Sequence, residues 1–567
     1  MSSSLTPLHT AAAEAVAAHA GVAARALKVE APPRPELGDL AVGCFAIAKA
    51  TKQNPAAVAQ AIAAAFQPNE WLASATAAGP FVNFRANRAA TFAWLAQGKL
   101  VPSAIGTGQT IVIDYSSPNV SKHLAYHHIR STMIGHALVQ IFRALGYRVA
   151  GINHLGDWGT THGKLLAAYE MWGAEYPEPL DVAKLNELYV RFSAAERADA
   201  AIKERGRAAF KQLEDGDAQF RVLWERFRDI SLGEYDEVYK LLGVTFDVVK
   251  GESDYLADVP GVLAELAAKQ LSSTSQGALV VELPGEKVPL MLRKDDGATT
   301  YATRDIPSAM WRWSTYHFAR SLYVVDRGQS LHFRQLFKTL ELMGYEWASR
   351  CEHIPFGLVT IGGAKGSTKS GNVVLLKDVV AEADSRVRAL LAEINPELTG
   401  DALDRVAHQV GVGSIVFANL ASQRDKDVAF EWDRVIALHG DSGPYVQYNH
   451  ARCASILRKA PARSGAAIEF SKLTSDAEWA VAKKLLEFSY AIVAATPRCE
   501  PHVICHYLLE LAGEFARWYT AGNTDASLRV LVDDAVVREA RLALVDAVRS
   551  VLAQGLAMLG LASPDQM

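Results

Sequence analysis

Thr110-Ile111-Val112-Ile113 is the stretch that decides the fold. This short apolar run is followed by the polar segment Ser116-Ser117-Pro118-Asn119 and then by apolar residues at helical spacing through Leu145. Apolar runs of this length are typical of parallel strands that are buried on both faces. The same order of strand, loop and helix recurs from Arg148 and again from Ser321. The repetition predicts an α/β fold with a doubly wound parallel sheet, whose ligands bind at the carboxyl ends of the strands.

The rest of the chain divides around this sheet. Residues 1–105 combine an alanine-rich helical pattern with a strand-like segment at 81–84, which predicts a small α+β domain. Residues 106–385 form the predicted sheet domain, in which a charge-rich helical pattern at about 175–270 indicates an insertion. From residue 386 to residue 567 strand signals vanish and helical periodicity dominates, which predicts an α-helical bundle.

Length and composition limit the classes of protein to which the chain can belong. It has 567 residues, 50% of them hydrophobic and 21% charged, so it is neither a disordered tail nor a disulfide-stapled miniprotein. The formal net charge is −4, so any nucleic-acid contact must rest on a local patch. We expect a cytoplasmic protein without a membrane partner. The five cysteines include no C-x-x-C pair, and neither a leader segment nor an apolar run of about 18 residues is evident.

Residues 114–122 join the first predicted strand to a helix. Such a junction directs backbone N–H groups and the positive end of the helix dipole at an anion, and Lys122 adds a positive charge there. The alternative is an ordinary turn with a Ser or Asn cap, because the segment has no G-x-x-x-x-G-K-[ST] phosphate fingerprint. His123 and His127 follow at a spacing that metal sites use on helices. No third ligand is evident nearby, so solvated or capping histidines are the alternative there.

Two further segments suggest ligand chemistry. The loop at 362–372 holds four glycines together with Lys365 and Lys369, so it can close over a triphosphate; a solvated surface loop is the alternative. Tyr301 and Asp305 are four residues apart, so on a helix both project into one pocket. A carboxylate beside an aromatic hydroxyl suits a guanidinium, whereas the alternative is a surface Asp305 paired with Arg304.

These segments together resemble the arginyl-tRNA synthetase family of class I aminoacyl-tRNA synthetases, over nearly the whole chain. The resemblance implies a Rossmann-like catalytic domain between an N-terminal domain that contacts the tRNA elbow and a helical anticodon-binding domain. Besides residues 114–119 and the lysine loop, it rests on Glu36-Leu37-Gly38-Asp39-Leu40, Gly79-Pro80-Phe81-Val82-Asn83-Phe84, Ile129-Arg130-Ser131-Thr132, Asn153-His154-Leu155-Gly156-Asp157-Trp158-Gly159, Leu292-Arg293-Lys294, Gln329-Ser330-Leu331-His332-Phe333, Asp441-Ser442-Gly443-Pro444-Tyr445-Val446-Gln447-Tyr448 and Leu559-Gly560-Leu561.

The resemblance also implies roles for individual residues. Those expected to bind arginine are Asp114, Ser117, Asn119, His128, Tyr301, Asp305 and Gln329, with Asp114 standing where the family usually has glutamate. Those expected at the ATP are His127, Gly156, Asp157, Lys365 and Lys369. Those expected to act in catalysis are Lys122, His128, Lys365 and Lys369. In the lysine loop Gly366, Lys369 and Ser370 replace the family's Met, Arg and Lys.

One signature departs from the family pattern. The class I sequence His-Ile-Gly-His falls on Ala125-Tyr126-His127-His128, so only the last histidine is kept. Loss of a donor that steadies the triphosphate costs on the order of 3 kcal/mol, a hundredfold or more in rate. His127 replaces a glycine that lets the adenine approach the helix backbone, so its ring obstructs the usual ATP pose unless the nucleotide shifts.

The resemblance implies an arginine–tRNA ligase of protein biosynthesis, with L-arginine, tRNA and ATP with Mg²⁺ as its partners. We expect a monomer. The altered signature leaves two alternatives. One is a paralogue repurposed for tRNA-independent activation of arginine, for example to form an amide in a biosynthetic pathway or to sense the amino acid. The other is a non-catalytic protein that binds tRNA or arginine.

Overall fold

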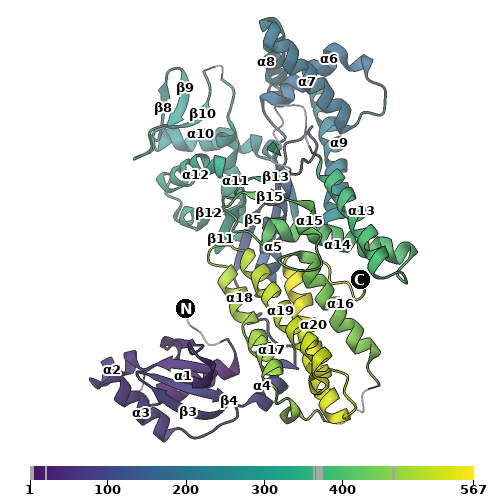
Figure 1. Ribbon diagram of the computed structural model, residues 1–567. Helices are drawn as coiled ribbons and strands as arrows, with labels where there is room; N and C mark the ends of the chain where they lie inside the picture. The colour runs from purple at the N-terminus through teal and green to yellow at the C-terminus, as the bar shows by residue number, and fades with distance from the viewer. Residues whose placement is uncertain (1–4, 20–21, 296, 362–363, 366–373, 463–466) are drawn as a thin grey trace.

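The computed structural model describes residues 5–19, 22–295, 297–361, 364–365, 374–462 and 467–567. Figure 1 shows a small N-terminal domain at the lower left and a helical arm at the top. A bundle of long C-terminal helices runs down from the central sheet. Among the described residues, no helix combines the length and the apolar character that a membrane span needs.

The central sheet is parallel and has the order β12-β11-β5-β6-β7. It confirms the predicted α/β class, and its three inner strands are those that the apolar runs predicted. The strands are β5 (Thr110–Asp114), β6 (Arg148–Leu155), β7 (Val248–Gly251), β11 (Arg320–Tyr323) and β12 (Cys351–His353). All five residues of β5 are buried, as expected for a strand at the centre of such a sheet.

Helix α5 (His128–Ala144) packs closely on the end of β5 and continues to the predicted limit. The side chain of Ser131 accepts from Ser116 N at 3.0 Å and donates to Val324 O at 2.7 Å, so it joins the helix to two strand ends. A Cβ at Gly135 would lie 2.1 Å from Tyr115 Cβ, so only glycine permits this approach. The junction between strand and helix is therefore fixed at its first turn.

The N-terminal domain is a four-stranded antiparallel sheet covered by helices, as the α+β pattern predicted. Its sheet has the order β1-β2-β4-β3. The elements are α1 (Pro7–Ala17), β1 (Val29–Glu30), β2 (Leu40–Gly43), α2 (Phe45–Thr51), α3 (Pro55–Ala65), β3 (Leu72–Ala78), β4 (Phe81–Ala86) and α4 (Arg88–Leu95). Asp39 joins this domain to the C-terminal bundle, because its Oδ1 accepts from Trp479 Nε1 at 2.7 Å.

The helical arm and the elements that follow it frame one side of the sheet. The arm consists of α6 (Thr160–Trp172), α7 (Val182–Ala198), α8 (Ala200–Glu214) and α9 (Ala218–Leu242). It is followed by α10 (Val259–Ala268), β8 (Ser272–Ser275), β9 (Ala278–Val281), β10 (Leu290–Arg293), α11 (Tyr301–Tyr316) and α12 (Ser330–Leu342). The segment 175–270 is mostly helical, as expected, but it also contains β7, which pairs with β6 as the edge strand of the central sheet. This strand is short and half exposed, so it lacks the apolar run that marked the inner strands.

The C-terminal region is helical, as predicted, with one exception. Strand β15 (Val428–Phe430) pairs in parallel with β13 (Val359–Ile361), which in turn pairs with β14 (Ala364–Lys365), so strand structure does recur after residue 386. Its three residues are too few to give a sequence signal. The helices are α13 (Leu376–Ile394), α14 (Gly400–Leu420), α15 (Trp432–Val435), α16 (Gly443–Lys459), α17 (Asp476–Leu486), α18 (Phe488–Ala495), α19 (His502–Thr524) and α20 (Ala535–Met558).

One hydrophobic core runs through all three regions. The same cluster of buried side chains contains Leu8 and Phe92 from the N-terminal domain, Ile113 from β5, and Trp479 and Leu556 from the C-terminal bundle. Phe92 and Trp479 meet edge to face with ring centroids 5.7 Å apart. The three regions are therefore packed as one body.

Candidate active site

Tyr301 and Asp305, the pair predicted to suit a guanidinium, lie one turn apart on α11, which begins at Tyr301. Both contact His332 in the first turn of α12. His332 Nε2 lies 2.7 Å from Asp305 Oδ2, and the His332 and Tyr301 rings meet edge to face with centroids 4.6 Å apart. The spacing of four residues therefore does bring the two side chains to one place, and a histidine from the next helix joins them.

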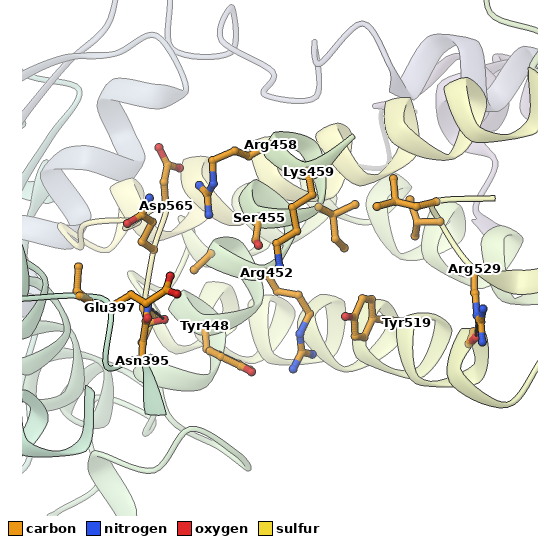
Figure 2. A pocket seen from close by; sticks show the side chains of 18 of the residues that line it. Asn395, Glu397, Tyr448, Arg452, Ser455, Arg458, Lys459, Tyr519, Arg529 and Asp565 are labelled. Atoms are coloured by element: carbon orange, nitrogen blue, oxygen red, sulfur yellow. Dashed lines mark hydrogen bonds between the residues drawn. The ribbon is translucent and has the colours of Figure 1, made fainter. Parts of the chain in front are cut away.

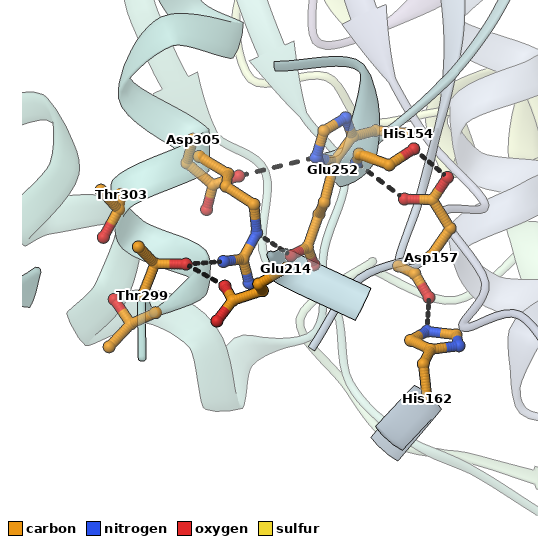
Figure 3. A network of polar contacts seen from close by, with 12 residues as sticks. His154, Asp157, His162, Glu214, Glu252, Thr299, Thr303 and Asp305 are labelled. Carbon is orange, nitrogen blue, oxygen red and sulfur yellow. Dashed lines mark hydrogen bonds and ion pairs between the residues drawn. The ribbon is translucent and has the colours of Figure 1, made fainter. Parts of the chain in front are cut away.

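A second histidine lies on the other side of the Asp305 carboxylate. His154, at the end of β6, has its Nε2 3.6 Å from Asp305 Oδ1 (Figure 3). Burial alone would raise the pKa of Asp305, but the contacts with His154 and His332 hold this pKa below its usual value. The Asp305 side chain is still 19% exposed, so the ionised carboxylate can accept a cationic ligand.

Glu252 is a candidate that sequence reasoning missed. It follows β7 at the same edge of the sheet, and its Oε2 accepts from Arg304 Nε at 2.6 Å. Burial raises the pKa of Glu252, Arg304 opposes that rise, and the nearby charge of Asp305 adds to it. Arg304 thus pairs with Glu252 and also donates to Thr299, so the alternative that placed it on Asp305 is wrong.

A cavity of about 500 Å³ opens beside this cluster. Its volume lies in the range of pockets that bind small molecules. Its wall carries an acid, a phenol, an imidazole and cationic groups, contributed by Glu252, Lys294, Tyr301, Arg304 and His332. Because these residues follow β7 and β10 or begin α11 and α12, the cavity adjoins the carboxyl end of the sheet, where the fold predicted a ligand.

Asp114, predicted to face arginine, uses its carboxylate within the protein. Its Oδ2 accepts from Arg312 Nη2 at 2.8 Å, and its Oδ1 accepts from Ser117 Oγ at 2.7 Å. Arg312 is only 1% exposed and Asp114 only 6%. The negative charge of Asp114 is therefore balanced by Arg312, and its carboxylate holds the loop at Ser117.

The loop after β5 carries Ser117 and Asn119. Ser116, Ser117 and Ser121 have φ values of 70°, 49° and 67°, a region that residues other than glycine rarely adopt. Ser117 N donates to Asn153 Oδ1 at 3.1 Å, so the loop is tied to β6. Asn119 is exposed and pairs through its backbone with Gly156, where an added Cβ would lie 2.1 Å from Asn119 Oδ1. The loop is thus held in a strained form beside Gly156.

The signature segment is not helical before His128. His123 and His127 would share one face only if a helix ran through both of them. Ala125 bridges to Leu375 and α5 begins only at His128, so His123 and His127 do not lie on one helical face. His123 instead pairs with Glu234 at 2.7 Å. Among the described residues, no group of three or more His, Cys, Asp or Glu side chains is arranged to hold a metal ion.

His128, the histidine that the signature keeps, is half-buried and neutral. Burial, followed by the neighbouring His127 ring at 4.1 Å between centroids, lowers the pKa of His128 to about 3. His128 Nδ1 lies 3.0 Å from Ala125 N and 3.1 Å from Ala125 O, so it accepts from the amide in one tautomer and donates to the carbonyl in the other. In both tautomers the ring is neutral over the whole physiological pH range.

Both sides of the lysine loop are fastened to this segment and to α14. Tyr126 N donates to Val374 O at 2.8 Å, and the Tyr126 hydroxyl accepts from Asn419 Nδ2 at 3.1 Å. The Tyr126 ring also packs edge to face on Phe430 of β15. Lys369 lies outside the described residues, and of Lys365 only the backbone, in β14, is described.

The remaining predicted residues are spread around the site. Lys122 Nζ lies 5.4 Å from the centroid of the Tyr189 ring on the arm. Asp157 is fully buried, and its carboxylate accepts from Ser253 N at 2.9 Å and from Arg228 Nε at 3.2 Å. The Asp157 side chain therefore stabilises the loop. Only the backbone of Asp157 and of Gly156 is left to contact a nucleotide. Gln329 is exposed, one turn before His332.

A second, larger cavity lies in the C-terminal bundle. Its volume is about 770 Å³. Arg452 lies over the rings of Tyr448 and Tyr519, at 4.6 Å and 4.9 Å from their centroids, and Arg458 and Lys459 line the same cavity (Figure 2). Aromatic rings combined with cationic side chains are the composition that single-stranded nucleic-acid sites use. This cavity supplies the local patch that the overall charge required.

Three known family models together match most of the chain. Residues 91–432 match the family of class I tRNA synthetases for arginine, catalytic domain. Residues 446–567 match the DALR anticodon binding domain, and residues 7–86 match the arginyl tRNA synthetase N terminal domain.

Individual relatives give the same result. An arginine–tRNA ligase of Clostridium perfringens is 40% identical over 550 residues, which cover 95% of this chain and 96% of the relative. One from Exiguobacterium sibiricum is 42% identical over 548 residues, 95% of each chain. The solved structure of Thermus thermophilus arginyl-tRNA synthetase superposes with a TM-score of 0.83 at 28% identity and covers 99% of this chain and all of that one.

Proposed function

This chain belongs to the arginyl-tRNA synthetase family, and we propose that it attaches L-arginine to the 3′ end of tRNA with the use of ATP. The observation that carries the proposal is the ionised Asp305, held by His332 and His154 beside Glu252 and a cavity of about 500 Å³. A half-buried carboxylate that stays ionised can accept a cationic ligand, and arginine supplies a guanidinium. The relatives named above are arginine–tRNA ligases over nearly the same length.

In this proposal the arginine lies between the ends of β5 and α11. Asp305 and Tyr301 receive the guanidinium, and Glu252 adds a second negative charge close by. Ser117, Asn119, His128 and Gln329 are proposed to face the other end of the amino acid. Asp114 acts by fixing the loop that holds Ser117, since its own charge is balanced by Arg312.

The proposed reaction has two steps. First, an arginine carboxylate oxygen attacks the α-phosphorus of ATP, which forms arginyl-adenylate and releases pyrophosphate. Second, a hydroxyl of the tRNA 3′-terminal ribose attacks the carbonyl carbon, which forms the ester and releases AMP. Neither step needs a covalent enzyme intermediate, so the protein contributes orientation and stabilisation of the phosphate charge.

Several groups suit the ATP half of this reaction. In the tautomer whose Nδ1 accepts from the Ala125 amide, the neutral His128 would offer its Nε2–H to a phosphate oxygen. Lys122, Lys365 and Lys369 are proposed to neutralise the developing charge. The backbone at Gly156 and Asp157 and the ring of His127 would then border the nucleoside. Mg²⁺ would be bound by the triphosphate, because the described residues contain no cluster able to hold it alone.

The tRNA is proposed to contact both ends of the chain. The cavity around Arg452, Tyr448 and Tyr519 suits an unstacked base, since its rings and guanidinium offer flat surfaces. It lies within the region that matches an anticodon binding domain. The N-terminal domain would meet the elbow of the same tRNA. We further propose that the protein acts as a monomer in the cytoplasm.

The test is attachment of radiolabelled arginine to tRNA with ATP, compared with release of AMP when tRNA is omitted. Charged tRNA at a turnover of roughly 1 per second or faster supports the proposal. AMP release without charged tRNA would instead favour a repurposed enzyme that activates arginine for another acceptor. Inertness in both assays, with tRNA still bound, would leave a binding protein.

A further inference from the structure

We propose that His332 is a positioning residue that orients the Asp305 carboxylate for the guanidinium of the substrate. The inference rests on the proposed function and adds a residue to it. His332 stands in the first turn of α12 and is 7% exposed. It contacts both side chains that are proposed to receive the guanidinium, Asp305 through a hydrogen bond of 2.7 Å and Tyr301 through ring packing at 4.6 Å.

The hydrogen bond fixes one oxygen of the carboxylate and leaves room for a ligand on the other lone pairs. Each carboxylate oxygen has two acceptor positions, and His332 Nε2 uses one of those on Oδ2. A guanidinium forms its two parallel hydrogen bonds only when the carboxylate lies in its plane. Holding Oδ2 sets the plane of the carboxylate before the substrate arrives, so less rotational freedom is lost on binding.

Other side chains that can carry a positive charge lie near the carboxylate. The Arg304 guanidinium is on the neighbouring residue of α11 and lies against Glu252, while His154 Nε2 is 3.6 Å from Asp305 Oδ1. The bond to His332 therefore fixes the Oδ2 side of the carboxylate, while Oδ1 lies toward His154.

The alternative is that His332 serves only as packing, since its ring also meets that of Phe333 at 5.1 Å between centroids. Two substitutions separate the roles. His332→Gln keeps an N–H donor at about the position of Nε2 and loses the ring, whereas His332→Phe keeps a ring of similar size and loses the donor. Positioning and packing thus predict opposite orders for the two variants.

The experiment measures arginylation by the full-length chain, with KM for arginine, KM for ATP, kcat and the melting temperature of each variant. We expect His332→Phe to raise the KM for arginine about tenfold, the size of one hydrogen bond to a charged group, with little change in kcat or in the KM for ATP. We expect His332→Gln to stay within about threefold of the unsubstituted protein.

His353→Phe is the matched control. Its imidazole stacks on Phe333 with ring centroids 4.7 Å apart and lies outside the proposed site, so its loss should leave the KM for arginine unchanged. If His332→Phe does not fold, His332→Met serves as the variant without a donor. Equal values of the KM for arginine in the Gln and donor-free variants, or a larger rise in Gln, would overturn the proposal. Failure of the unsubstituted protein to charge tRNA would instead refute the proposed function.

Discussion

The two halves of the proposed site differ in how they hold their ligand. On the arginine side, His154 of β6, Tyr301 of α11 and His332 of α12 gather around the Asp305 carboxylate. On the ATP side, the signature has become Ala125-Tyr126-His127-His128, and in our proposal recognition is left to the backbone, to the neutral His128 and to the lysine loop. In that proposal selectivity for the amino acid would depend on a few charged groups. Use of ATP would depend on close approach to the backbone, which tolerates more exchange of side chains.

The strongest way to break this comparison is to remove the central carboxylate. Asp305→Ala leaves His154 and His332 facing each other without an anion, so we expect arginine binding to fall by at least a hundredfold. Calorimetry with L-arginine measures the loss. Asp404→Ala, which removes a carboxylate paired with Arg388 in the C-terminal region, is the control. Unchanged affinity in Asp305→Ala would refute the assignment of the pocket.

The ATP half is tested by restoring the family signature. Ala125→His restores a histidine that can donate a hydrogen bond to the triphosphate, and His127→Gly lets the adenine approach the helix backbone. We expect the double substitution to raise kcat/KM for ATP about tenfold, measured by pyrophosphate exchange. His127→Gly alone separates the steric part, because Ala125 is itself only 2% exposed and a larger side chain must find room there. A loss of activity in both variants would show that this half has been rebuilt around the imidazole.

The pH dependence should differ between the two halves. Burial alone would lower the pKa of His154, but Asp305 and Asp114 raise it above its usual value, so His154 is neutral at high pH and gains a positive charge as the pH falls toward that value. The added charge competes with the guanidinium for Asp305. We therefore expect the KM for arginine to rise about fivefold from pH 8.5 to pH 6, and His154→Asn to remove this rise. The pKa of His128, at about 3, predicts no matching change in the KM for ATP through that residue.

The smallest expected effect concerns the hydroxyl that joins the signature to α14. Tyr126→Phe removes only the hydrogen bond from Asn419 Nδ2, so we expect kcat for pyrophosphate exchange to fall about threefold while the KM for arginine stays constant. Tyr507→Phe, which loses a buried hydroxyl bonded to Lys484 O in the bundle, is the control. A rise in the KM for arginine in Tyr126→Phe would mean that the two halves are not independent.

The sequence predicted those parts of the site that depend on local spacing. Tyr301 and Asp305 needed only the period of a helix, and the inner strands needed only their apolar runs. Glu252, His154 and His332 come from three separate segments, so their meeting depends on the order of the strands and helices in space. Glu252 was also hidden because β7 is stabilised by its pairing with β6 and has no apolar run of its own.

The metal interpretation of His123 and His127, to which solvated or capping histidines are the alternative, fails for a different physical reason. It needs a helix that extends back from α5, but the backbone there contacts a distant segment. Ala125 bridges to Leu375 and Tyr126 donates to Val374 O, so the helix cannot begin before His128. Pairing with a segment about 250 residues further along the chain cannot be read from local pattern.

The hydrophobic core that runs from Leu8 through Ile113 to Leu556 has a consequence for how the molecule can be divided. If residues 1–105 were removed, Trp479 would become exposed to solvent. In the intact chain its indole contacts Phe92 and donates to Asp39. Heat or denaturant should therefore melt the parts of the molecule that share this core together. Grafts that exchange one region between relatives would succeed only when the residues on both sides of this shared interior are exchanged together.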